Sequence, residues 1–561
     1  MAIALETLRP APLDPAAEQV MVPMRDGVRL ATDVYLPVRP GRLPTVLVRL
    51  PYDKCGRYTF MPLVAPYFTD RGYASVVQDV RGKFRSEGET MAFVHEVDDG
   101  YDTLEWIVGQ SWSDGRVGMF GDSYYGFTQW AAVASGHPAL KAIVPRVTSS
   151  DLKVLTSWWG DSVVQLYGAD YLAHYWADPL IYFFEADWSH RPLAEVYDEG
   201  FAAIGARAAS FDVMIRQTGP RSIVQYPSGH PFDKLRIPAL HSVGWFDNIS
   251  PASLEDYATL RSRRELAHLQ YLVADATDHE NYHLRYVPVS TENDHDINDE
   301  ALARMLPVYL GPGLAFFDAL LKGEGDAADI PMAEWYLGHE EWHKSPTWPP
   351  PGARELRLYL SAPERAASGA EGGALMRSAE SGAGVARWVH DPADLVPSTV
   401  ANPFAFLLEW PDEREIERRD DVLTFTGEPV EEPLDLAGPV SAWVTVGSSG
   451  PSMHVFAKLC DVDPDGATHM LVRGERLVPE PDFGKPVEVT MSHTGYRLRP
   501  GHRLRLHVAS SDFPLYLWHP GTDENPWFAT EGTANQQTLA TGGSAPSYVS
   551  LTILSRQAKG D

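Results

Sequence analysis

Short apolar runs alternate with helical patterns through the first part of the chain. Continuous apolar segments at residues 44–50, 73–78 and 116–120 are typical of strands that are buried on both faces. Residues 98–108 and 127–134 instead carry apolar positions at helical spacing. This alternation of strand and helix predicts an α/β fold with a mainly parallel sheet.

Further strands are predicted on both sides of this region. Residues 20–37 are predicted to form a hairpin, because two apolar-rich runs flank the dipeptide Asp26-Gly27, which suits a tight turn. Buried strands are expected again at 237–244 and 269–274, with a helix at 251–264 between them. One α/β domain therefore continues beyond residue 230.

Two further regions differ from this domain. Between residues 149 and 229 the strand signals vanish and aromatic residues become frequent, which predicts a helical insert. After a Pro-rich joint at 348–352, short strand-like segments follow one another as in a β-sandwich or jelly roll, with a mobile loop at 366–384. We expect the first part of the core at 1–148, the helical cap at 149–232, the second part of the core at 233–350 and a C-terminal β domain at 351–561.

Composition restricts the class of protein. A chain of 561 residues is too long for one hydrophobic core, and its net charge of −29 disfavours binding to nucleic acid or to an anionic membrane. Two cysteines, Cys55 and Cys460, exclude a disulfide framework. The first 20 residues do not resemble a signal peptide, and no apolar run approaches the roughly 20 residues that span a bilayer. We therefore expect a soluble, cytoplasmic protein, and a homodimer is left open.

The strongest chemical signal is the sequence Gly-Asp-Ser-Tyr-Tyr-Gly at 121–126, between a predicted strand and a predicted helix. This position suits a nucleophile elbow, which exposes the hydroxyl of Ser123 above the sheet. The generic elbow has Gly two residues after the serine, whereas Tyr125 stands there and Gly126 follows. A plain tight turn is the alternative interpretation.

A serine nucleophile needs an acid and a histidine, in that order, after later strands. Asp247 follows the predicted strand at 237–244, and His279 follows the one at 269–274. The order and spacing fit, but the residues alone leave rivals open. These are Asp275 and Asp278 for the acid and His283 for the base.

Several motifs together resemble the cocaine esterase and X-Pro dipeptidyl-peptidase family of serine hydrolases, over nearly the whole chain. They are the elbow with Gln129-Trp130, Gln-Asp-Val-Arg-Gly at 78–82, Ser-Glu-Gly at 86–88, Pro-Tyr-Asp at 51–53, Gly-Trp-Phe-Asp at 244–247 and Asp-Asp-Val-Leu-Thr-Phe at 420–425. The resemblance implies an α/β-hydrolase core, a helical cap and a C-terminal jelly roll. In that family the nucleophile elbow likewise has Gly three residues after the serine.

The resemblance further implies the roles of five residues. Ser123 would be the nucleophile, His279 the general base and Asp247 its orienting acid, while the Tyr52 hydroxyl and the Tyr124 amide would form the oxyanion hole. Two departures are visible. The sequence Ala-Thr-Asp-His-Glu-Asn at 276–281 replaces the family's common Pro-Trp-Ser-His, and Ser-Met-His at 452–454 stands where the family commonly has Asp.

The aromatic insert predicts an apolar or aromatic acyl pocket beneath a cap. The expected substrate is a small-molecule ester or amide, and esterase, amidase, acylase and peptidase activities all stay open. Glu185, Asp187 and Asp170 could bind a substrate amine, as carboxylates do elsewhere in the family. The candidate substrate-binding residues are Trp158, Trp159, Trp176, Phe246 and Ile249.

Two metal-like patterns are judged to be decoys. The segment His-Glu-Glu-Trp-His at 339–343 matches a zinc-protease pattern but lies between Gly338 and Pro346, where a helix is not expected. The calcium-like run at 294–298 lacks the glycine and the final acid of a calcium loop. We expect no metal and no cofactor. A catalytically dead binding protein on a hydrolase fold is the non-enzymatic alternative.

Overall fold

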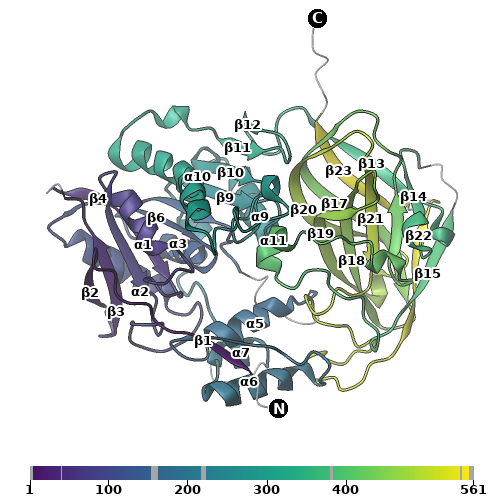
Figure 1. The fold of residues 1–561 in the computed structure, drawn as a ribbon, viewed down its shortest axis with the longest axis horizontal. Helices are drawn as coiled ribbons and strands as arrows, with labels where there is room; N and C mark the ends of the chain where they lie inside the picture. Colours follow the sequence, from purple (N-terminus) through teal and green to yellow (C-terminus); the bar gives the residue numbers. More distant parts are fainter. Residues whose placement is uncertain are drawn as a thin grey trace, which may run out of the picture.

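The computed structural model describes residues 4–38, 41–152, 162–216, 223–379, 383–543 and 546–554. Figure 1 shows three regions: a sheet covered by helices, a large β domain beside it, and a group of helices that lies against both.

The first region is a ten-stranded sheet with a parallel centre and antiparallel edges. In spatial order its strands are β12 (Trp342–Ser345), β11 (Ala333–Tyr336), β10 (Gln270–Asp275), β9 (Ala239–Gly244), β7 (Leu140–Arg146), β6 (Ser113–Asp122), β4 (Leu43–Leu50), β5 (Ala74–Asp79), β3 (Arg29–Tyr35) and β2 (Glu18–Pro23). The sequence-based prediction of an α/β fold with a mainly parallel sheet is confirmed.

Helices cover both faces of this sheet, which explains the continuous apolar runs of its strands. The helices are α1 (Met61–Thr69), α2 (Glu96–Val108), α3 (Ser123–Ser135), α8 (Pro231–Lys234), α9 (Ser250–Ser262) and α10 (Asp299–Phe317). In β4, Val46 clusters with Phe68 of α1 and Phe317 of α10, whereas the adjacent Leu47 clusters with Leu104 of α2 and Trp130 of α3. Successive residues of one strand thus enter two different cores.

One helix, at Asp299–Lys322, is long and apolar enough by composition to cross a membrane. Its side chains Leu310, Phe316 and Phe317 are fully buried, and they cluster with sheet residues such as Phe120 and Val144. This packing is that of a core helix on the sheet.

The cap contains α5 (Leu166–Tyr175), α6 (Val196–Ile204) and α7 (Ala209–Met214), as the predicted helical insert requires. It also contains a strand, β8 (Ile181–Phe184), which pairs antiparallel with β1 (Leu5–Leu8) at the start of the chain. The expectation of an insert without strands is therefore wrong at this point. A four-residue strand whose partner lies far away in sequence leaves no periodic signal.

The second large sheet has eleven strands and forms the β domain on the right of Figure 1. Its path runs through β15 (Gly384–His390), β22 (Asn535–Thr541), β17 (Leu434–Ser448), β23 (Tyr548–Leu554), β13 (Ala353–Ser361), β14 (Gly373–Met376), β16 (Leu423–Thr426), β21 (Arg503–Ala509), β18 (Ser452–Val462) and β19 (Thr468–Pro479), and β20 (Pro486–Leu498) pairs with β17. The short helix α11 (Phe406–Glu409) lies at the side that faces the first sheet. Strand β14 falls within the predicted loop at 366–384, so that expectation is corrected: it pairs with β13 and β16.

Candidate active site

Ser123 is the first residue of α3, immediately after β6, and its backbone is left-handed with φ of +50°. This strained turn lifts the serine out of the strand. A Cβ at Gly121 would lie 2.1 Å from Cδ2 of Tyr125, and one at Gly126 would lie 2.4 Å from Cγ2 of Thr148. Both glycines are therefore needed, and Tyr125 occupies the space that the missing Cβ of Gly121 leaves.

His279 and Asp247 lie in the loops that follow β10 and β9, two adjacent parallel strands. The Nδ1 of His279 donates a hydrogen bond to Oδ1 of Asp247 at 2.8 Å, and the Ile249 amide donates to the same oxygen at 3.1 Å. Both side chains are buried. The bond fixes the imidazole so that its Nε2 is the nitrogen left to exchange a proton.

Two opposing effects act on the pKa of His279. Burial lowers the pKa, because it disfavours the charged imidazolium, whereas the charge and hydrogen bond of Asp247 raise it. Asp247 prevails with help from other carboxylates, and the pKa of His279 lies above its ordinary value of 6.5. Such a histidine is a base that accepts a proton readily.

The rival residues form separate contacts. His283 pairs with Asp275 at 3.1 Å, beside a smaller cavity of about 370 Å³. Asp278 accepts backbone hydrogen bonds from Leu407 at 2.8 Å and from Tyr282 at 2.9 Å, so it holds the loop that carries His279. The geometry favours Asp247 and His279 as the acid and base.

Tyr52 lies in the loop after β4 and is almost fully buried. Burial raises the pKa of its phenol, and the nearby hydroxyls of Tyr171 and Ser123 oppose that rise. The ring is held edge to face by Tyr58 at 5.4 Å and Tyr175 at 5.6 Å. A neutral phenol fixed beside Ser123 can donate a hydrogen bond to an oxyanion.

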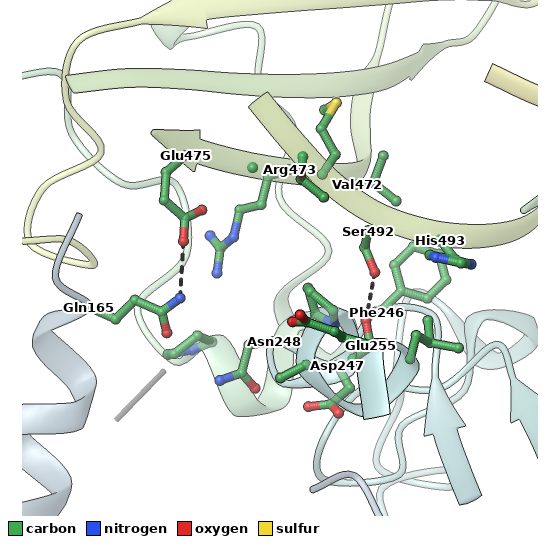
Figure 2. Close-up of a pocket in the computed structure, with 18 of the residues that line it drawn as sticks. Gln165, Phe246, Asp247, Asn248, Glu255, Val472, Arg473, Glu475, Ser492 and His493 are labelled. Carbon is green, nitrogen blue, oxygen red and sulfur yellow. Dashed lines mark hydrogen bonds between the residues drawn. The ribbon is translucent and has the colours of Figure 1, made fainter. Parts of the chain in front are cut away.

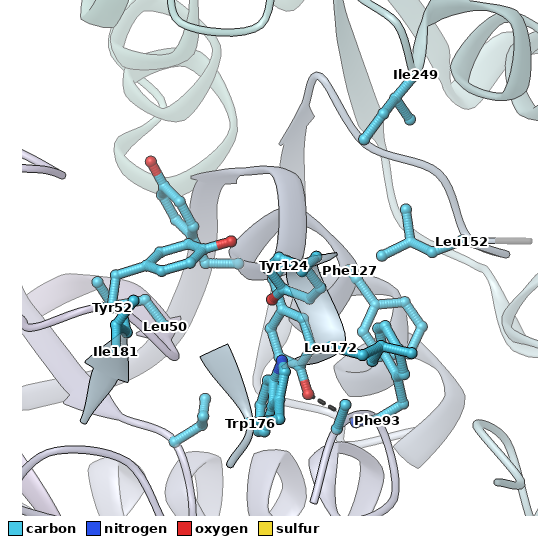
Figure 3. Close-up of a cluster of buried hydrophobic side chains, with 14 of the residues drawn as sticks. Leu50, Tyr52, Phe93, Tyr124, Phe127, Leu152, Leu172, Trp176, Ile181 and Ile249 are labelled. Carbon is cyan, nitrogen blue, oxygen red and sulfur yellow. Dashed lines mark hydrogen bonds between the residues drawn. The ribbon is translucent and has the colours of Figure 1, made fainter. Parts of the chain in front are cut away.

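Tyr124 is anchored in the core by its side chain (Figure 3). Its hydroxyl donates to Glu96 at 3.0 Å and accepts from the amide of Phe93 at 2.8 Å. Its own amide lies in the first turn of α3, where helical amides have no carbonyl partner within the helix. That amide, together with the positive end of the helix, is available to a developing negative charge.

The structure places the predicted substrate-binding residues in different surroundings. Trp176 is fully buried with its ring 5.1 Å from that of Tyr124, and Ile249 belongs to the same buried cluster (Figure 3). Phe246 stacks on Phe406 of the β domain at 6.0 Å. Trp158 and Trp159 lie outside the described residues. Contact of any of these five residues with substrate stays a prediction.

A cavity of about 790 Å³ borders the acid loop (Figure 2). Asp247 and Asn248 line it from the core, Arg473 and Glu475 from β19, and Gln165 from the start of α5. Gln165 donates to Glu475 at 3.2 Å. The cap, the core and the β domain therefore meet beside Asp247.

Three residues near His279 escaped the sequence analysis. The ring of Phe404, from the β domain, lies 4.8 Å from the imidazole, and the Phe404 carbonyl accepts the amide of Glu280 at 3.1 Å. The Glu280 carboxylate accepts a hydrogen bond from the Tyr58 hydroxyl at 3.2 Å. The unusual glutamate after His279 was the one signal available in the sequence.

Four other groups that the sequence analysis singled out lie in structural roles. Asp170 accepts from Tyr197 at 2.9 Å within the cap, and Asn298 caps α10 by accepting from two backbone amides. His339 sits in a turn, whereas His343 lies in β12 and stacks on Trp335 at 4.6 Å, so the zinc-like pattern lacks its helix. In the ranges that the structure describes, no group of three His, Cys, Asp or Glu side chains could hold a metal ion.

A serine on a strand-to-helix elbow, with an Asp–His pair on the loops of later strands, defines an α/β hydrolase of the serine hydrolase class. The profile of the X-Pro dipeptidyl-peptidase family (S15) matches residues 26–281, and that of the X-Pro dipeptidyl-peptidase C-terminal non-catalytic domain matches residues 326–550. Cocaine esterase of Rhodococcus sp. is 34% identical over 545 residues, which cover 89% of this chain and 91% of that protein.

Solved structures agree. An α-amino acid ester hydrolase superimposes with a TM-score of 0.76 at 26% identity, over 97% of this chain and 98% of its own. An aminopeptidase from a marine sediment archaeon, Thaumarchaeota archaeon, shares the fold with a TM-score of 0.75 at 24% identity, over the same shares of the two chains. The chain belongs to the cocaine esterase and X-Pro dipeptidyl-peptidase (S15) family, as its motifs predicted, and is a serine hydrolase that acts on esters or amides.

Proposed function

We propose that this enzyme cleaves carboxylic esters through an acyl-enzyme on Ser123, with Asp247 and His279 completing a catalytic triad. The observation that carries the proposal is the 2.8 Å bond from Nδ1 of His279 to buried Asp247, which lie in the loops after β10 and β9. The bond selects the tautomer whose Nε2 can take the serine proton.

The reaction follows from these positions. The Oγ of Ser123 attacks the ester carbonyl as His279 accepts its proton, and the Tyr52 hydroxyl and Tyr124 amide stabilise the oxyanion. The carbon–oxygen bond to the alcohol then breaks, and the imidazolium of His279 protonates the departing oxygen. Water repeats the attack on the acyl-enzyme, again with His279 as base, and releases the acid and free Ser123.

An apolar acyl group suits the surroundings of the elbow. Tyr124, Trp176, Leu172 and Ile249 belong to one buried cluster that joins the cap to the core. Esters are favoured over amides because an amide needs protonation of a poor leaving group, which makes it more sensitive to the exact position of His279. We retain Phe246, Trp158 and Trp159 as candidate acyl contacts.

A fluorophosphonate label followed by peptide mass spectrometry tests the nucleophile. We expect one adduct, on Ser123, and loss of both label and turnover in Ser123→Ala. Ser135→Ala, at the other end of the same helix, is the matched control and should keep both. Labelling elsewhere, or turnover near wild type in Ser123→Ala, would refute the triad.

A substrate panel tests the leaving group and the acyl group separately. It contains apolar aryl and alkyl esters, the matching amides, α-amino esters and X-Pro dipeptide amides. We expect the apolar esters to give the highest kcat/KM. A preference for X-Pro amides would make the protein a dipeptidyl-peptidase with the same triad.

A further inference from the structure

The smaller cavity, of about 370 Å³, lies between helix α10 and the strands β9 and β10. Val243 and Val273 line it from the strands, and Met305 lines it from the helix. Its volume falls in the range of roughly 300–1,000 Å³ that is usual for pockets that bind small molecules. Neither Ser123 nor His279 is among its walls, so the cavity is distinct from the proposed acyl-enzyme site.

One apolar stripe of α10 faces this cavity. Its residues follow one another at helical spacing, which places them on one side of the helix, and all of them line the cavity: Ala301, Met305, Val308 and Pro312. Val308 is nevertheless 61% exposed. An apolar stripe that the chain leaves uncovered can be covered favourably by the apolar part of a ligand.

Aromatic residues and arginines surround the mouth of the cavity, where its lining reaches solvent. Tyr286 and Trp342 are 46% and 37% exposed, and Arg285 and Arg304 are exposed as well. Arg304 donates a hydrogen bond to the Glu292 carbonyl at 2.7 Å, but within the described ranges neither arginine forms an ion pair with a carboxylate. The mouth therefore carries two positive charges that no carboxylate neutralises directly.

The charged groups inside the cavity already have partners. Arg146 donates hydrogen bonds to Asp122 and to Asn281, each at 3.0 Å. Asp275 is the only carboxylate among the described residues that line the cavity, and His283 binds it at 3.1 Å. The interior thus offers mainly apolar contacts, whereas the mouth offers positive charge.

We propose that this cavity binds an apolar monocarboxylate of the medium-chain fatty acid type. The chain lies against Val273 and the stripe of α10, and the carboxylate faces Arg285 and Arg304 at the mouth. An arginine fork matches the geometry of a carboxylate, and one anionic head group on an apolar chain fits the division between mouth and interior. This inference is independent of the proposed function, because it uses no residue of the triad or of the oxyanion hole.

Isothermal titration with butanoate, hexanoate and octanoate measures the affinity of the site. We expect one octanoate to bind per chain, and the Kd to fall about fourfold for each added methylene, because each methylene leaves water. Octylammonium has the same chain but the opposite charge, and it should bind about tenfold more weakly. Protein labelled at Ser123 by a fluorophosphonate should give the same Kd for octanoate, although its acyl-enzyme site is blocked.

Substitutions at exposed residues test the mouth without disturbing the core. The double variant Arg285→Gln with Arg304→Gln should weaken octanoate binding about tenfold, because two solvent-exposed ion pairs are lost. Val308→Glu should weaken it several-fold more than the uncharged Val308→Gln, since only the glutamate brings a negative charge to the mouth. Arg264→Gln, at an exposed arginine in the turn after α9, is the matched control and should keep the Kd.

Equal affinity for octanoate and octylammonium, or an unchanged Kd in the arginine double variant, overturns the inference. Loss of octanoate binding on labelling of Ser123 also overturns it, because the ligand then occupies the acyl-enzyme site. A dimer in sedimentation that Val308→Glu dissociates would make a second copy of the chain the occupant of this face, again against the inference. Ester hydrolysis and fluorophosphonate labelling are measured on the same variants and should equal those of wild type, so a failure of the proposed function appears separately.

Discussion

Removal of one hydroxyl at Tyr52 tests the proposed oxyanion hole with little disturbance to the fold. In Tyr52→Phe the ring keeps its edge-to-face contacts with Tyr58, Tyr125 and Tyr175 at 5.4, 6.0 and 5.6 Å. We expect unfolding to become easier by only about 1 kcal/mol, the usual net value of one hydrogen bond.

Catalysis should suffer far more than stability. The hydroxyl lies beside Ser123, and the neutral phenol donates most strongly when the carbonyl oxygen becomes an anion. Loss of one such donor costs roughly 10²–10³ in kcat, or about 3–4 kcal/mol of transition-state stabilisation. KM should change little, because the ground-state carbonyl binds the phenol weakly.

Steady-state hydrolysis of an apolar aryl ester measures both constants, and thermal melts of the same samples verify folding. Tyr35→Phe is the matched control: it also removes the hydroxyl of a buried phenol, which donates to Asp14 at 3.1 Å and has no part in the proposed reaction. It should leave kcat unchanged. If Tyr52→Phe raised KM and kept kcat, Tyr52 would be a binding residue, and the oxyanion assignment would be refuted.

Two further predictions concern pH. Because the pKa of His279 is raised above 6.5 and only the neutral imidazole accepts the Ser123 proton, the acidic limb of kcat/KM should lie above pH 6.5; a limb below that value would contradict the proposed pairing with Asp247. Burial holds the pKa of His454 well below 6.5, and its two ring nitrogens are buried without hydrogen-bond partners. His454 therefore binds a proton in the unfolded chain but not in the folded chain. The free energy of unfolding should fall as pH drops below about 6.5, by up to roughly 1.4 kcal/mol per pH unit for this group. His454→Phe should reduce that slope in urea titrations between pH 7 and 5, and an unchanged slope would contradict this account.

Residues fixed by local chain geometry could be anticipated from the sequence. Ser123, Asp247 and His279 each follow a buried strand, and parallel strands bring such loops to one edge of the sheet. The strands of the core were likewise visible as continuous apolar runs. The position of an element, in these cases, follows from its own residues.

Contacts between distant segments could not be anticipated in this way. Tyr58 and Glu280 are 222 residues apart, and neither belongs to a periodic pattern that predicts their meeting. Phe404 contacts His279 from another domain and lies in the turn Pro403–Ala405. The apolar residues of that turn cannot be told from core residues in the sequence. Strand β8 is defined by its pairing with β1 rather than by its composition.

Residues 404–407 of the β domain contact the loop after β10, which carries His279, so the β domain helps to position the site of the core. The Phe404 carbonyl accepts the amide of Glu280, the Leu407 amide donates to Asp278, and the ring of Phe404 packs on the imidazole. The domain matched by a profile described as non-catalytic therefore holds the segment that carries His279, the proposed base. Truncation or exchange of that domain would remove these three contacts from the loop that carries His279, so variants of the two domains should be selected together rather than separately.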